Sequence, residues 1–136
     1  MSAATGADAS IAPSTGAVVG SVRLWLRLEG LAVAAVGAYL YARGGYSWVL
    51  FATLILVPDV SFAAFLAGPR VGALAYNVLH SYLGPLALGA MSLAGGWSPA
   101  IALIWAVHIG FDRLVGYGLK YPTAFRDTHL GVIGRR

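Results

Sequence analysis

The stretch that decides the fold is VGALAYNVLHSYLGPLALGAMSLAGGWSPAIALIWAVHIGF, residues 71–111, which contains no Asp, Glu, Lys or Arg. A helix needs about 20 apolar residues to cross the hydrocarbon core of a membrane, which is about 30 Å thick. The stretch is long enough for two such helices, and Gly95 and Gly96 provide a turn between them. It therefore predicts two consecutive membrane-spanning helices.

The composition of the whole chain also indicates a membrane protein. Of its 136 residues, 59% are apolar and 10% are charged, and the mean hydropathy is +0.77. A soluble domain carries about 25% charged residues, so this composition excludes an ordinary cytosolic enzyme and a disordered chain. The net charge of +4 comes from scattered basic residues, so we expect no nucleic-acid partner. The chain has no cysteine, which excludes disulfides and thiolate metal sites.

Two further apolar stretches of membrane-spanning length precede this region, and glycine and proline residues separate all four. We expect a transmembrane domain over residues 22–121, with spans at about residues 24–42, 46–67, 71–93 and 98–120. Pro122 is expected to end the fourth helix, because the residue before a proline leaves the α region. Since the loops are short, neighbouring helices run antiparallel, and the predicted fold class is an all-α bundle of four transmembrane helices.

The basic residues fall mainly on one side of such a bundle, and only Arg43 falls on the other. The larger group contains Arg23, Arg27, Arg70, Lys120, Arg126, Arg135 and Arg136. Basic residues favour the cytoplasmic side, so the pattern predicts cytoplasmic N and C termini. Outside the bundle we expect a disordered tail at residues 1–21 and a cytoplasmic segment at residues 122–136.

Three local patterns concern the helices themselves. Small residues on the first span are expected to allow close helix approach: Gly30, Ala34, Gly37 and Ala38. Pro58 cannot donate to the carbonyl of Leu54, which leaves an extra buried acceptor just before Asp59. Trp105 is interpreted as lipid-facing or packing surface, without a further role.

An ionisable side chain within a membrane span is expected to have a structural or functional role, because burying it costs at least about 2.5–3.5 kcal/mol. The rise of about 1.5 Å per residue predicts two layers of polar side chains. The layer near the midplane contains Asp59, His80 and His108. The layer about one turn nearer the cytoplasm contains Glu29, Asn77 and Asp112.

Each of these residues also has a purely structural interpretation. A single histidine in a membrane helix is more often a hydrogen-bond partner between helices than a ligand. Asp59 would then be a neutral acid, and Arg113, after Asp112, would extend to the lipid headgroups. The C-terminal sequence YGLKYPTAFRDTHLG, residues 117–131, is expected to pack under the bundle and to bring His129 towards the inner layer.

The chain resembles a bacterial family of short four-span membrane proteins catalogued only as a domain of unknown function. The resemblance rests on RLEG at 27–30, PDVS at 58–61, GPRVGALAYNVLH at 68–80 and HIGFDRLVGYGLKYPTAFRDTHLG at 108–131. It implies a multi-pass protein of the bacterial plasma (inner) membrane and implies no particular activity. It marks as family positions Glu29, Asp59, Asn77, His80, His108, Asp112, Arg113, Lys120, Tyr121 and His129.

Three functions remain open, because the sequence contains no established catalytic motif. The first is a divalent-metal site for Zn, Mn or Fe with hydrolase-like chemistry. Its predicted metal ligands are His80, His108, Asp112 and His129, and Asp59 is the predicted catalytic base or a further ligand. Other buried polar residues are Glu29, Asn77, Arg113, Lys120 and Tyr121.

The second function is a proton- or ion-coupled transporter with Asp59 and His108 as a relay, which requires a homodimer because four helices make a thin pathway. The third is a structural or accessory membrane subunit, in which the polar cluster only locks the helices together. All three predict the lipid bilayer as the surroundings of the protein, and a homo-oligomer is compatible with each.

Overall fold

The computed structural model describes residues 16–134, whose regular elements are helices and one short hairpin, joined by turns and loops. The helices are α1 (Gly20–Arg43), α2 (Trp48–Leu54), the 3₁₀ helix η1 (Val57–Ala67), α3 (Pro69–Leu79), α4 (Leu83–Ala94) and α5 (Ala100–Val115). The strands β1 (Asp127–Thr128) and β2 (Gly131–Val132) pair antiparallel, with Asp127 opposite Val132. The predicted all-α fold class is confirmed.

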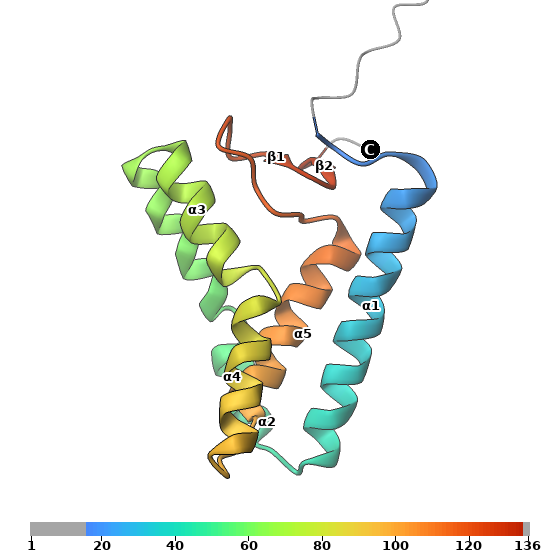
Figure 1. The fold of residues 1–136 in the computed structure, drawn as a ribbon, viewed down its shortest axis with the longest axis vertical. Coiled ribbons are helices and arrows are strands. Elements are labelled where there is room, and N and C mark those ends of the chain that lie inside the picture. Colours follow the sequence, from blue (N-terminus) through green and yellow to red (C-terminus); the bar gives the residue numbers. More distant parts are fainter. Residues whose placement is uncertain (1–15, 135–136) are drawn as a thin grey trace, which may run out of the picture.

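The chain runs up and down the long axis of the molecule several times, and both ends of the described part lie together (Figure 1). α1 runs to one end, α2 and η1 return, α3 and α4 lead back, and α5 returns again beside α1. The segment after α5 then meets the residues before α1. The Val18 N–H donates to the His129 carbonyl at 2.8 Å, and the Tyr121 hydroxyl donates to the Gly16 carbonyl at 2.7 Å.

Two helical segments are long and apolar enough to cross a membrane, Gly20–Arg43 and Trp48–Ala67. They contain the first predicted span, 24–42, and most of the second, 46–67. Large apolar side chains also cover the outside of the molecule, and Leu66 is 93% exposed. α1 begins inside the predicted tail 1–21, because residues 20 and 21 are already helical, and residues 1–15 of that tail lie outside the described residues.

The third predicted span, 71–93, is not one helix, and this part of the prediction is wrong. α3 ends at Leu79, and α4 begins at Leu83. Pro85 gives the physical reason, because in an unbroken helix its ring would clash with the carbonyl of Ser81. The break places Pro85 in the first turn of α4, where a proline needs no N–H partner.

The carbonyl groups at the end of α3 receive side-chain donors from α5. Trp105 Nε1 donates to the Leu79 carbonyl at 2.6 Å, and Arg113 Nη2 donates to the His80 carbonyl at 2.6 Å. A buried carbonyl without a partner costs about 1–3 kcal/mol, so these two bonds make the break tolerable. Trp105 therefore has the capping role that the sequence analysis did not assign to it.

The second predicted span also changes character at a proline. α2 ends at Leu54, the residue whose carbonyl Pro58 cannot bond, and the chain continues as η1. Asp59 lies in the first turn of η1. A tighter helix turns its side chains by a different angle per residue, so the change at Pro58 redirects Asp59 relative to a continuous α-helix.

The fourth predicted helix, 98–120, ends earlier than expected, at Val115 rather than before Pro122. Gly116 has a φ of +102°, a left-handed conformation that favours glycine and ends helices. The N–H groups of Gly116 and Tyr117 both donate to the Asp112 carbonyl, at 3.0 and 2.7 Å. The residues after Gly116 therefore leave the helix and turn over its end.

α1 and α5 approach closely along glycine and alanine residues, as predicted for the small residues of the first span. A Cβ atom on Gly30 would lie 2.7 Å from the Gly110 carbonyl oxygen. A Cβ atom on Gly110 would lie 2.7 Å from the Gly30 carbonyl oxygen and 2.8 Å from the Ala34 nitrogen. This contact fixes the position of α5, which carries half of the candidate site.

Candidate metal centre

Four polar side chains from three separate segments meet inside the molecule. Asp59 comes from η1, His80 follows the last residue of α3, and His108 and Asp112 lie one turn apart on α5. One ligand atom from each residue lies within 4.8 Å of the other three. The two histidines and Asp112 are buried, and Asp59 is half-buried. The structure thus brings together four of the residues that the sequence singled out.

Each of the four distances between an imidazole nitrogen and a carboxylate oxygen in this cluster suits two ligands of one tetrahedral ion. His80 Nε2 lies 3.3 Å from Asp59 Oδ1 and 3.5 Å from Asp112 Oδ2. His108 Nε2 lies 3.5 Å from each of these oxygens and 3.1 Å from His80 Nε2. Bonds of about 2.0–2.2 Å to a tetrahedral zinc ion place its ligands about 3.3–3.6 Å apart. The sixth distance, between the carboxylate oxygens, is at most 4.8 Å.

The main chain sets the tautomer of His80. Its Nδ1 lies 3.0 Å from the Tyr76 carbonyl oxygen, which can only accept a hydrogen bond. A neutral imidazole that donates from Nδ1 carries its lone pair on Nε2, the atom that faces the cluster. The Tyr76 ring stacks on the His80 ring at 3.7 Å between centroids and 10° between planes, which holds this orientation.

An outer hydrogen bond of this kind is the usual support of a metal-ligating histidine. The sequence analysis did not single out Tyr76. Its only signal was its position four residues before His80, one helical turn away, which is visible only when the role of His80 is known.

With both carboxylates ionised, the four atoms present more lone pairs than protons. With Nε2 of His80 unprotonated, a proton on His108 Nε2 satisfies only one of its neighbours. The Asp59 oxygen, 3.3 Å from His80 Nε2, then faces another lone pair at short range. A divalent cation between the four atoms satisfies all of them at once. Two imidazoles and two carboxylates are ligands that suit Zn, Mn or Fe.

His129, the fourth predicted metal ligand, is not brought to this cluster. Its Nδ1 accepts a hydrogen bond from the Leu119 N–H at 2.8 Å, and its carbonyl accepts from Val18. His129 therefore joins the C-terminal segment to the residues before α1. Among the described residues, the structure thus places Asp59, and not His129, beside His80, His108 and Asp112.

Asn77 and Lys120 attach the C-terminal segment to α3. The Asn77 side chain donates to the Lys120 carbonyl at 2.9 Å and accepts from the Lys120 N–H at 2.7 Å. Lys120 is 3% exposed, and its ammonium group donates to the Phe125 carbonyl. The ammonium also lies 3.7 Å from the centre of the Phe125 ring and 4.9 Å from that of Tyr76, where the ring faces attract a cation.

Arg113 is buried and does not extend to the lipid headgroups, which corrects that interpretation. Its guanidinium donates to the carbonyls of Tyr117 and His80, each at 2.6 Å. Glu29 is exposed on α1, and within residues 16–134 it has neither an ion pair nor a hydrogen bond. The two predicted layers are therefore wrong in detail, because Asp112 joins the three residues of the upper layer and Glu29 stands apart.

His129 should make the stability of the protein depend on pH. Burial, followed by the nearby charge of Arg113, lowers the pKa of His129 below its ordinary value of 6.5. The folded state then binds fewer protons than the unfolded state, so its stability is complete above pH 6.5 and falls as the pH drops. Thermal unfolding of the wild type and of His129→Gln between pH 8 and 5 measures this. The destabilisation on acidification should be smaller in the variant, and equal pH dependence in both proteins would contradict the assignment.

Comparison with known proteins gives one match. A family model described as "Domain of unknown function (DUF4260)" matches residues 23–133. No curated protein and no solved structure matches the chain significantly. The matched region contains all four residues of the cluster. The predicted resemblance to an uncharacterised family is confirmed.

Proposed function

This chain belongs to the family described as a domain of unknown function (DUF4260), and we propose its function from the geometry of the site. We propose an integral membrane protein that binds one divalent metal ion, Zn, Mn or Fe, through Asp59, His80, His108 and Asp112. The bound ion would serve hydrolase-like chemistry near one face of the membrane.

The observation that carries the proposal is the convergence of two imidazole nitrogens and two carboxylate oxygens at distances of 3.1–3.5 Å. These atoms come from η1, the end of α3 and α5, so no single helix imposes the geometry. Helix packing alone does not require two imidazoles and two carboxylates from three separate segments to meet at one place. Their burial is costly unless a cation compensates it.

The two carboxylates differ in a way that suggests separate roles. The Asp59 side chain is 32% exposed and the Asp112 side chain 12% exposed, so Asp59 is the more accessible. A bound metal ion lowers the pKa of a coordinated water to about 7 and polarises an ester or phosphoryl oxygen. We assign Asp112 to binding the ion. Asp59 either binds the ion as a further ligand or acts as the base that accepts a proton from the attacking water, the two roles predicted for it from the sequence.

Four crossings of the bacterial plasma membrane, with cytoplasmic N and C termini, belong to the same proposal. In support, α3 and α4 together and α5 cross the molecule beside the two apolar segments (Figure 1). The ends of the described chain and the start of α3 lie on one side (Figure 1). α1 carries Arg23 and Arg27 in its first two turns, α3 carries Arg70 at its start, and Arg43 is the last residue of α1. Basic residues favour the cytoplasmic side.

Cysteine labelling tests this orientation without background, because the chain has no native cysteine. Ser47 lies between α1 and α2, and Ala124 lies in the C-terminal segment; both are exposed. In intact cells, Ser47→Cys should react with an impermeant thiol reagent and Ala124→Cys should react only after permeabilisation. The reverse pattern would place the C-terminal segment outside the cell.

The second candidate function, a structural subunit with an interhelical lock, is favoured by one distance. His108 Nε2 and His80 Nε2 lie 3.1 Å apart, which also suits a direct N–H···N hydrogen bond. Such a bond joins α5 to the end of α3 without an ion.

Elemental analysis of protein purified without a polyhistidine tag distinguishes the two candidates. The metal proposal predicts about one Zn, Mn or Fe ion per chain, retained through gel filtration. Asp112→Asn and His108→Ala should each lose it. Asn77→Ala should keep it, because the Asn77 side chain forms hydrogen bonds with the Lys120 main chain and is not one of the four clustered residues. If the wild-type protein folds without metal and takes up none when metal is supplied, the metal proposal is excluded and the interhelical lock remains as the candidate function.

A further inference from the structure

The metal cluster lies between two cavities of different character. The larger one is a groove of about 660 Å³, with α1 on one side, α2 and η1 on the other, and α5 as its floor. Apart from Asp59, His108 and Asp112 its lining is apolar. Residues along it are accessible from outside, since Leu31 is 43% and Leu56 66% exposed. The groove therefore opens towards the surrounding lipid.

The smaller cavity, of about 220 Å³, lies under the C-terminal segment. It shares Asp59 and Asp112 with the groove and adds Lys120, Tyr117 and the aromatic rings beside the Lys120 ammonium group. The two carboxylates thus stand at the junction of an apolar passage and a polar compartment. A molecule lying across the junction would present its central atoms to the metal ligands.

The charge of the smaller cavity favours an anion once the proposed ion is bound. A divalent cation offsets the charges of Asp59 and Asp112, and the Lys120 ammonium then leaves the compartment positive. Lys120 has three N–H donors, of which Phe125 accepts one. Lys120 can therefore donate a charged hydrogen bond to an anionic oxygen in this cavity, and such a bond is stronger than one between neutral groups.

We infer that the substrate of this site is a membrane lipid with an anionic head group, its chain in the groove and its head group beside Lys120. This inference rests on the proposed metal function, because it takes the metal to be bound. It explains why the groove and the polar compartment meet at the carboxylates. An apolar chain can enter the groove from the bilayer without crossing water. A soluble substrate would have no need of an apolar groove that opens towards lipid.

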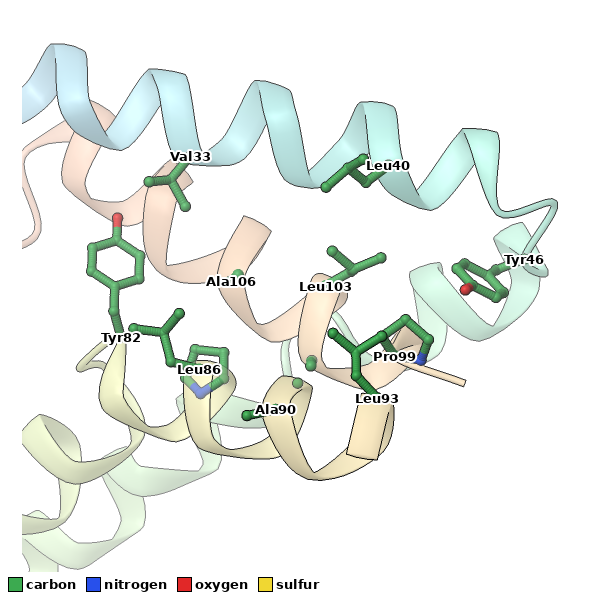
Figure 2. Close-up of a pocket in the computed structure, with 13 residues that line it drawn as sticks. Val33, Leu40, Tyr46, Tyr82, Leu86, Ala90, Leu93, Pro99, Leu103 and Ala106 are labelled. Atoms are coloured by element: carbon green, nitrogen blue, oxygen red, sulfur yellow. The ribbon is translucent and has the colours of Figure 1, made fainter. Parts of the chain in front are cut away.

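A second apolar cavity serves as the internal control. It measures about 830 Å³ and lies between α1, α4 and α5, with Val33 facing Leu86 and Ala90 across it (Figure 2). Among the residues that line it there is no carboxylate, imidazole or ammonium group. It offers space for a lipid chain and nothing that selects a charged head group.

The test is native mass spectrometry in detergent, with phosphatidylglycerol and diacylglycerol of equal chain length, which lacks the anionic phosphate, titrated separately. Phosphatidylglycerol should bind about tenfold more tightly, the amount expected from one charged hydrogen bond. Lys120→Gln should remove this preference. Ala35→Trp, which fills the groove, should weaken phosphatidylglycerol binding about tenfold. Ala90→Trp, an exposed alanine of the second cavity, should leave it unchanged.

Metal content measured on the same samples separates the two proposals. If the wild type holds its metal but binds both lipids equally, or if Ala35→Trp and Ala90→Trp behave alike, the lipid inference is overturned and the metal proposal stands. If the wild type holds no metal, the metal proposal fails, and the lipid inference fails with it, because the charges of Asp59 and Asp112 are then not offset. Glycerophosphate without a chain should not displace the lipid, and displacement would favour a soluble anion instead.

Discussion

With a divalent ion in excess, His80→Ala and His108→Ala should each remove most of the metal-dependent stability, and the double variant should lose little more. Both nitrogens face the same point, and residues that act on one site are strongly non-additive. An ion at about a hundredfold excess over its dissociation constant stabilises the folded state by about 2.7 kcal/mol. Thermal unfolding in detergent, with and without the ion, measures the loss in each variant.

His129→Ala is the matched control, because it removes an imidazole that lies outside the cluster. It should change stability through the contacts of the C-terminal segment and leave the effect of added metal intact. If the histidines of the cluster only join helices, each substitution should cost about 0.6 kcal/mol, and the two costs should add. Additive losses that do not depend on metal would therefore contradict the metal site.

Gly110→Ala should destabilise the protein by about 1–3 kcal/mol through overpacking, although alanine is the better helix former. The added methyl group would lie 2.7 Å from the Gly30 carbonyl oxygen and 2.8 Å from the Ala34 nitrogen, both main-chain atoms of α1. Main-chain atoms of a helix cannot move aside without separating α1 from α5. Because Gly110 lies between His108 and Asp112 on α5, metal content should fall together with stability.

Gly89→Ala provides the comparison within the same protein. Gly89 is also inside a helix, and its added methyl group would meet only the Ala102 Cβ, at 3.6 Å, an ordinary contact. This variant should be as stable as the wild type or up to about 1 kcal/mol more stable, because glycine disfavours helix. Equal effects at Gly89 and Gly110 would show that the α1–α5 contact is not the close one described.

The sequence was sufficient to predict where helices occur, because apolar stretches of membrane-spanning length carry that information directly. It was not sufficient to predict where they break. The run from residue 71 to 93 contains no Asp, Glu, Lys or Arg, and the consequence of Pro85 depends on which residue begins the new turn. The break at 80–82 is stable because Trp105 and Arg113 reach carbonyls at the end of α3 from a helix distant in sequence. Only the folded chain shows that pairing.

The site was predictable as a set of residues at similar depth, and less so as a geometry. Asp59, His80 and His108 were expected together because ionisable groups in an apolar span need partners. Asp112 was predicted to lie one turn away from these three residues. The rise per residue gives the depth of the main chain, and it does not give the position of the carboxylate at the end of the side chain. His129 was misplaced for a different reason. Gly116 turns the chain after α5, and the direction of such a turn follows from contacts with Asn77 and Val18.

The most direct test of the account is the response of the melting temperature to a chelator, in the wild type and in His108→Ala. A chelator should lower the melting temperature of the wild type clearly, because the folded state loses a ligand that the unfolded state does not hold. In His108→Ala the same chelator should change it hardly at all, and re-addition of the metal should restore only the wild type. Identical responses in the two proteins would contradict the account, because the cluster would then hold no ion.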